Sequence, residues 1–238
     1  MEKKYRLLED DTITVSGRTL YRIEALRDFA DVEKGSKGGY IESEDNLSHT
    51  GECWVYGSAR VCGDAWVYGD ARVYGNAWVY GTAWVYGNAR VYGDARVSGN
   101  AWVYGNVRVS GNVRVSGNVR VSGDACVSGN VRVSGDACVY GNARVSGNAC
   151  VYGNAHVSGN AKVSGNADYY VGKNVWSSGR YFTYTRSNRM WKVGCFYGTG
   201  EELIKKAYKD SEVSGREYKR VVEYVEAMYA DLEKDNSK

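Results

Sequence analysis

The two histidines are the side chains of this chain best suited to acid–base chemistry, because a neutral imidazole accepts a proton near pH 7. His156 occupies a position that holds Arg, Trp or Cys in neighbouring segments of the same pattern, so duplication with drift explains it. His49 lies where the regular pattern begins and is expected to help close that end. Serines such as Ser110 have no base in reach, so no Ser-His-Asp triad can be assembled. We therefore predict no catalytic residue, and His156 is the candidate to test.

Arginines recur at intervals of 18 residues and could hold an anion. Stacked guanidinium groups bind phosphate in a bidentate manner, and a tyrosine beside them could stack on a base. Like charges about 5 Å apart repel by only about 0.8 kcal/mol in water, so repeat duplication alone would also explain these rows. Both interpretations stay open. The predicted ligand-binding residues are Arg72, Arg90, Arg96, Arg108, Arg114, Arg120, Arg132, Tyr74 and Tyr92.

Tryptophans and tyrosines recur with the same interval over the first part of the pattern. Cross-strand ring stacking that stiffens the fold would account for them. A protein interface would account for them equally well, because Trp and Tyr are enriched at interface hot spots. The predicted oligomer interface consists of Trp66, Trp84, Trp102, Tyr68, Tyr86 and Tyr104.

Metal and cofactor chemistry are not expected. No two of the six cysteines are two or three residues apart, which argues against a zinc site. Gly-Asn-Ala opens no helix, so it is not a phosphate-binding loop. Four cysteines stand where similar segments carry Arg, Trp, Tyr or Ser, and they are predicted to be reduced surface substitutions: Cys62, Cys126, Cys138 and Cys150.

The elements that must position these residues are hexapeptides. From Gly51 to Gly165 every sixth residue is glycine, which gives twenty consecutive hexads of the form G-N/D-A-x-V-x. Ala and Val are two residues apart, so on a strand they point the same way, into the core, and the residues between and after them point outward. Glycine followed by Asn or Asp supplies the corner, since these residues tolerate left-handed conformations.

The motif V-x-G-N-A-x resembles the hexapeptide repeat of left-handed parallel β-helices, the fold of the hexapeptide acyltransferases. The resemblance covers residues 39–168 and implies an all-β solenoid in which three hexads form one 18-residue coil; the left-handedness comes from the resemblance alone. Stacking at this interval would place the Trp66, Arg60 and Trp54 series on three separate faces. The sequence departs from the family where Tyr or Ser follows the valine, a position that is normally small or acidic.

The ends of the chain lack the period. Residues 1–38 are predicted to form a β-hairpin cap around a turn at Ser16 and Gly17, and residues 169–238 to form a cap of a β-hairpin and two helices. Thr199 and Glu202 form a capping-box pattern at the first helix. The ends also resemble those of uncharacterised hexapeptide-repeat proteins from bacteria and their prophages.

Charge and hydropathy limit the partners. A net charge of +3 leaves no electrostatic footprint for nucleic acid, and the chain contains no run of 18 apolar residues, so neither nucleic acid nor a membrane is expected and the location should be cytoplasmic. We predict a non-catalytic binding protein, a homo-oligomer (trimer or dimer) of phage or prophage origin that sequesters an anionic small molecule such as a nucleotide, or a host partner. The alternatives are a trimeric acyltransferase and a purely structural scaffold.

Overall fold

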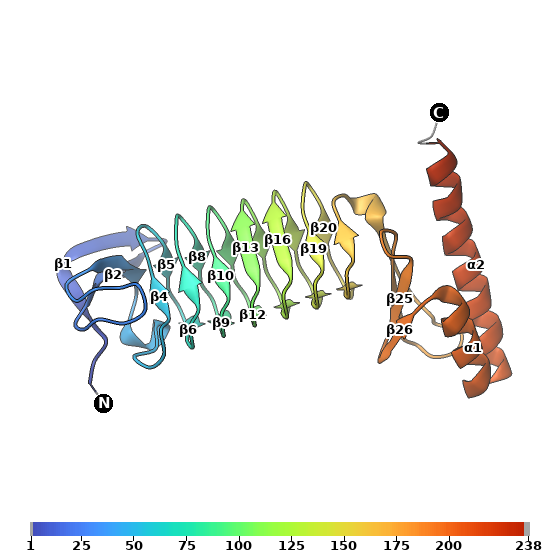
Figure 1. Cartoon of the computed structure of the whole chain (residues 1–238), viewed down its shortest axis with the longest axis horizontal. Helices are drawn as coiled ribbons and strands as arrows, with labels where there is room; N and C mark the ends of the chain where they lie inside the picture. Colours follow the sequence, from blue (N-terminus) through green and yellow to red (C-terminus); the bar gives the residue numbers. More distant parts are fainter. Residues whose placement is uncertain (1, 236–238) are drawn as a thin grey trace.

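The hexads fold as strands with alternating sides. In the computed structural model, which describes residues 2–235, Ala101 and Val103 are fully buried while Trp102 between them is 36% exposed. The inward positions are buried along the whole repeat, so a column of Val and Ala side chains fills the interior, and the outward residues are at least partly exposed except Trp54, Cys62 and Ser158. The chain is a left-handed parallel β-helix with 18-residue coils, as the sequence predicted (Figure 1).

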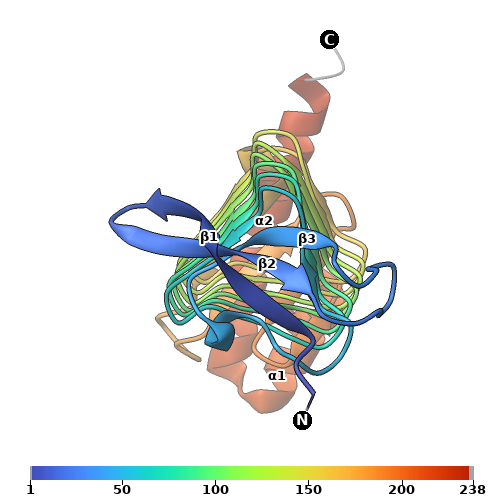
Figure 2. The same cartoon turned by 90° about the vertical axis from the view of Figure 1, so that its left-hand side faces the viewer.

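Three parallel sheets form the sides of a triangular prism, and each takes every third hexad (Figure 2). The tryptophan face consists of β6 (Trp66–Val67), β9 (Trp84–Tyr86), β12 (Trp102–Tyr104), β15 (Arg120–Val121), β18 (Cys138–Val139) and β21 (His156–Val157). The arginine face consists of β5 (Arg60–Val61), β8 (Trp78–Val79), β11 (Arg96–Val97), β14 (Arg114–Val115), β17 (Arg132–Val133) and β20 (Cys150–Val151). The groove face consists of β4 (Trp54–Val55), β7 (Arg72–Val73), β10 (Arg90–Val91), β13 (Arg108–Gly111), β16 (Cys126–Gly129), β19 (Arg144–Val145) and β22 (Lys162–Val163).

The register between coils is 18 residues on every face. Trp84 pairs with Trp102, and Arg96 pairs with Arg114. The backbone amide of Trp84 donates to the carbonyl of Ala101 at 2.9 Å, and the equivalent bond recurs from coil to coil. Each outward residue therefore lies directly against its counterpart in the next coil, and the sequence-based assignment of residues to faces is confirmed.

The corners differ from the prediction in one respect. Only the glycines take the left-handed conformation there, for example Gly117 with φ +86°, so the expectation that Asn and Asp share that role is wrong. The Asn side chains instead form ladders along the edges of the prism, as where Asn100 Nδ2 donates to Asn118 Oδ1 at 2.9 Å. Asn118 in turn donates to Asp136, which ends the run because a carboxylate has no hydrogen to donate. Asp94 and Asp124 end two other runs in the same way.

The N-terminal segment covers the first coil. A hairpin of β1 (Tyr5–Val15) and β2 (Arg18–Ala25) turns at Ser16 and Gly17, both with positive φ, and it is longer than the sequence suggested. The strand β2 pairs with β3 (Lys37–Ile41), and β3 pairs in parallel with β5, so the cap is continuous with the arginine face. A 3-10 turn, η1 (Glu44–Asn46), completes this end, across which the hairpin lies in Figure 2.

The C-terminal segment has its own core. After η2 (Asn166–Asp168) come an antiparallel sheet of β23 (Tyr169–Lys173), β24 (Tyr181–Thr185), β25 (Met190–Val193) and β26 (Phe196–Gly198), and the helices α1 (Gly200–Asp210) and α2 (Glu212–Asp235). The capping box at α1 is confirmed, since Thr199 N donates to Glu202 Oε2 at 2.8 Å. The helix α2 begins before Gly215 rather than after it, and its apolar side packs on Trp191 in this core. The sheet lies between the last coils and the helices (Figure 1).

The cysteines are all unpaired, but two of them are not surface residues. Cys62 stands in an outward position yet is only 2% exposed, because the indole of Trp78 covers it and donates from Nε1 to its Sγ at 3.3 Å. Cys53 replaces an inward alanine and is fully buried. The prediction of a surface position is therefore wrong for Cys62.

Candidate functional site

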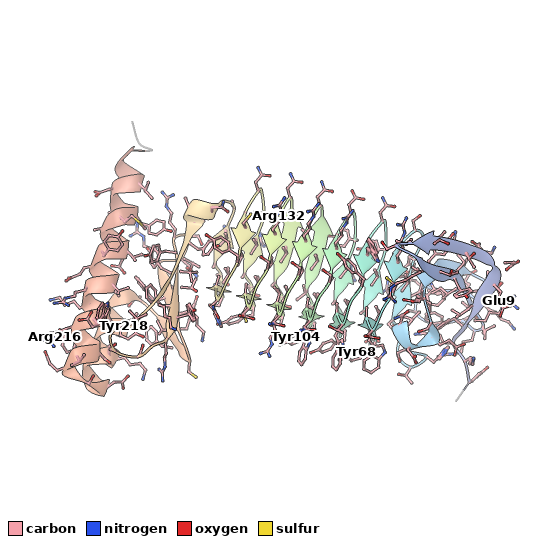
Figure 3. The ribbon with its side chains drawn as sticks, turned by 180° about the vertical axis from the view of Figure 1, so that it is seen from behind. Glu9, Tyr68, Tyr104, Arg132, Arg216 and Tyr218 are labelled. Carbon is pink, nitrogen blue, oxygen red and sulfur yellow. The ribbon has the colours of Figure 1, made fainter. Side chains whose placement is uncertain are left out.

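A stacked aromatic ladder marks the tryptophan face. The rings of Trp84 and Trp102 lie 5.3 Å apart and within 4° of parallel, and the rings of Tyr86 and Tyr104 lie 4.9 Å apart and within 3°. Tyr68 stacks on Tyr86 at 4.7 Å in the same way. Trp84 and Trp102 thus form one column, and Tyr68, Tyr86 and Tyr104 form a second. Figure 3 shows Tyr68 and Tyr104 projecting from the same side of the prism.

The stacking decides what this face can bind. Trp84 and Trp102 cover one flat face of each other, as do neighbouring rings of the tyrosine column, whereas Trp66 meets Trp84 edge to face and stacks on Tyr68. The columns therefore present mainly ring edges to solvent, and Trp66, Trp84 and Trp102 remain 36–38% exposed. A sugar or base that needs an open ring face finds one only at the end of a column. A contiguous strip of exposed indole edges is instead suited to burial against another protein surface.

The arginine face carries three cations in consecutive coils. Arg96, Arg114 and Arg132 pair in register and are exposed. Among the described side chains, those of residues 2–232, no carboxylate forms a salt bridge with any of the three. The corner residues two positions before Arg114 and Arg132 are the neutral Asn112 and Asn130, so these two guanidinium groups are free to meet an anion.

A groove of about 840 Å³ follows the third face. It lies between an edge of Asn and Asp side chains and the outward row of Arg72, Arg90, Arg108 and Arg144. Its charge is mixed, because three carboxylates, those of Glu52, Asp70 and Asp124, line it together with the four arginines. Arg72 is also held by Asp31 of the N-terminal segment at 3.1 Å. The groove is thus polar over its whole length, and less cationic than its arginines alone suggest.

The predicted stacking of a base on Tyr74 and Tyr92 meets a geometric limit. Their rings already lie 4.8 Å apart and within 2° of parallel, so the space between them is filled by their own contact. The predicted ligand-binding arginines are also divided among three faces. Arg108, Arg114 and Arg120 surround one coil but point in three directions, so a single small molecule cannot contact all of them.

His156 lies in a small cavity at the C-terminal end of the tryptophan face. Burial and the nearby Lys192 ammonium hold the pKa of its imidazole below the usual value, so the ring is neutral at pH 7. Cys138 lies one coil away in register, and burial raises the pKa of its thiol. A neutral base beside a protonated thiol on flat strands has no third group to orient it in the manner of a triad. Thr183 contacts this residue through the backbone only, since its Oγ1 accepts from the amide of His156 at 2.9 Å.

This cavity was missed by sequence reasoning. It has a volume of about 400 Å³ and is lined by Tyr104, Arg120, Ser122, Cys138, Tyr140, His156, Lys192 and Gly194. The 18-residue spacing of Tyr104, Ser122 and Tyr140 could have identified its floor. No pattern in the sequence places Lys192 there, because it comes from β25 beyond the repeat. Among the side chains that the structure describes, those of residues 2–232, no three His, Cys, Asp or Glu are grouped to hold a metal ion.

Comparisons with known families match the solenoid alone. The family described as "Bactofilin: Polymer-forming cytoskeletal" matches residues 83–171, and the family described as "YdcK Beta solenoid repeat" matches residues 65–81 and 71–87. No match was found among curated proteins. The resemblance to hexapeptide acyltransferases is not confirmed by these matches, whereas the β-solenoid is. Over residues 2–235, no helix is long and apolar enough to cross a bilayer.

Proposed function

We propose that this β-solenoid is a non-catalytic scaffold whose copies associate side by side through the tryptophan face. The observation that carries the proposal is the strip of six rings in register, of which three indoles are more than a third exposed. The description of the bactofilin family as polymer-forming and cytoskeletal supports self-association. That description is of the family, and its extension to this chain is part of the proposal.

Both ends of the prism favour lateral rather than end-to-end contact. At the first coil, the side chain of Asn46 donates to the carbonyls of Gly63 and Ala65 at 2.8 and 2.9 Å. At the last coil, Ser187 Oγ accepts from the amide of Lys162 at 2.6 Å, and the Tyr169 hydroxyl donates to the carbonyl of Cys150 at 2.7 Å. These backbone groups, which another solenoid would need for continued strand pairing, are already bonded. The sides of the prism are therefore the surfaces left for assembly.

Trp84→Glu is expected to reduce the assembly to single chains of 26.3 kDa in light scattering while leaving the β spectrum intact. The substitution places a charge at the centre of the ring strip, where desolvating it in an interface is costly. Ser116→Glu adds the same charge on the arginine face and should leave the assembly unchanged. A wild-type chain that is monomeric at tens of micromolar, or a Trp84→Glu chain that assembles like the wild type, would refute the proposal.

Anion binding on the arginine face is a second candidate function, favoured by the absence of acidic partners around Arg96, Arg114 and Arg132 among the described residues. A phosphate-bearing ligand along the axis would contact two or three guanidinium groups at once. If this second function holds, the protein sequesters a nucleotide-like ligand in the cytoplasm. Its phage or prophage origin stays a prediction. The acyltransferase alternative also stays a prediction, with His156 as its base.

Arg114→Ala is expected to weaken the binding of such a ligand by about 1.5–3 kcal/mol, the cost of a lost hydrogen bond to a charged group. Arg114→Lys should restore only part of the affinity, because an ammonium group carries the charge but cannot form the planar fork of a guanidinium group. Calorimetry with linear and cyclic nucleotides measures both effects, and Arg144→Ala on the groove face is the matched control. If no nucleotide binds more tightly than millimolar, the arginine row is inherited repeat surface.

A further inference from the structure

The tyrosine column of the tryptophan face is interrupted at Ser122, and it ends with Ser158 after Tyr140. Going up this column at intervals of 18 residues, the outward position after the valine is Tyr68, Tyr86, Tyr104, Ser122 and Tyr140. The groove face has serine at every later rung after Tyr92, and the arginine face has three serines between Tyr80 and Tyr152. A gap one rung deep with a ring on each side therefore occurs on the tryptophan face alone.

The gap has the size of an aromatic ring. Successive tyrosines of this column stack with centroids 4.7 and 4.9 Å apart, the spacing of neighbouring coils. Tyr104 and Tyr140 are two coils apart, or about 9.6 Å at the usual strand spacing. A planar ring placed midway, above the small Ser122 side chain, would lie at the stacking distance that the column itself uses. The upper face of Tyr104 has no ring from its own chain in the next coil.

The surroundings of the gap are cationic. Arg120 packs over the Trp102 ring at 5.4 Å, and the ammonium of Lys192 lies 5.9 Å from the centroid of Tyr140. Both line the 400 Å³ cavity, and no carboxylate is among its lining residues. His156, which meets Tyr140 edge to face at 6.4 Å, closes the far side. An uncharged ring would use the stacking surfaces only, whereas a ring with an attached anion would use the two cations as well.

We propose that this cavity binds a planar aromatic anion, with its ring between Tyr104 and Tyr140 above Ser122 and its negative group at Arg120 and Lys192. The cavity shares Tyr104 with the end of the ring strip, and its Arg120 covers Trp102, but its other lining residues lie beyond the strip, so ligand binding is tested apart from assembly. It also differs in place from the arginine row, since Arg114 lies on another face. The recognised chemistry is shared by nucleotides and by aromatic carboxylates, and the probes distinguish them.

The test is calorimetric titration of the full chain with adenosine 5′-monophosphate and with 2-naphthoate. Adenosine, which lacks the charge, and ribose 5-phosphate, which lacks the ring, should each bind at least about tenfold more weakly than the nucleotide, because each loses one of the two interactions. Binding of 2-naphthoate alone would assign the site to carboxylates, and binding of the nucleotide alone would assign it to phosphates. If neither probe binds in the millimolar range, the proposal is wrong.

Ser122→Tyr provides the decisive variant, because it fills the missing rung with the residue that the column carries on either side. The variant should fold with unchanged melting, since tyrosine already occupies this position at Tyr104, and should lose probe affinity by about tenfold or more. Ser110→Tyr places the same residue in the equivalent position of the groove face and should bind as the wild type does. Arg120→Gln with Lys192→Gln should weaken both probes and remove most of their salt dependence. Unchanged affinity in Ser122→Tyr would overturn the proposed location, whatever the state of assembly of the Trp84→Glu chain.

Discussion

Val103→Asp should destabilise the solenoid by at least about 3–5 kcal/mol, the effect of an uncompensated charge in a protein interior. Val103 is fully buried and lies in register between Val85 and Val121, so the carboxylate would have only methyl groups around it. The cost is a large part of the total stability of an ordinary domain, about 5–15 kcal/mol. Thermal melting followed by far-ultraviolet circular dichroism would show a loss of the cooperative transition or a much lower midpoint.

Ser116→Asp is the control for this substitution. Ser116 follows the inward Val115 and points outward, where a new carboxylate stays hydrated and lies near Arg114. Its melting midpoint should stay close to that of the wild type. If Val103→Asp were to melt like Ser116→Asp, the inward assignment of the valines would be wrong.

Gly117→Ala is expected to destabilise the fold by about 2–5 kcal/mol. The residue has φ +86°, where an L side chain costs about 1–2 kcal/mol. A Cβ atom would also lie 2.8 Å from the carbonyl oxygen of Gly135 in the next coil, and overpacking of this kind costs about 1–3 kcal/mol more. Denaturant titration measures the sum.

Gly153→Ala separates the two contributions. Gly153 has φ +63°, but nothing lies within 4 Å of the added methyl group, so only the conformational cost of about 1–2 kcal/mol should remain. The loss of backbone freedom in the unfolded chain is the same for both variants and cancels in the comparison. Equal destabilisation of the two variants would show that the corners are not packed coil on coil.

The solenoid could be predicted almost completely from the sequence, because one short pattern determines its conformation, its interior and its register. The two-residue spacing of Ala and Val identifies the interior, and the interval of 18 then assigns Trp84 and Arg114 to their faces. The ladders of Asn side chains were within reach too, since stacking at 18 places Asn100 against Asn118. The preference of Asn for turns already explained its place at the corners, so the sequence analysis did not predict the ladders.

The ends could be predicted only as elements. Lys4 is fully buried under the first coil, where its ammonium donates to the carbonyl of Cys53 at 2.8 Å and contacts its Sγ at 3.3 Å. Burial lowers the pKa of Lys4 and raises that of the Cys53 thiol. A lysine near an N-terminus is normally predicted to be solvent-exposed, and nothing in the local sequence indicates a contact with a residue 49 positions away. Lys192 escaped prediction for the same reason, because its contact with Tyr140 depends on how one segment packs on another.

The 18-residue coil also fixes how such a chain can change in length. Loss or gain of three hexads would move the C-terminal segment along the axis by one strand spacing and leave every outward residue on its own face. Loss or gain of one hexad would preserve the buried valines equally well, but it would rotate all that follows by a third of a revolution. A change of one hexad between Ser122 and the C-terminal segment would carry Lys192 to another side of the prism, away from the tyrosine gap. The number of hexads thus sets the angle about the prism axis between the two dissimilar ends. Relatives could be lengthened or shortened by whole coils without changing that angle.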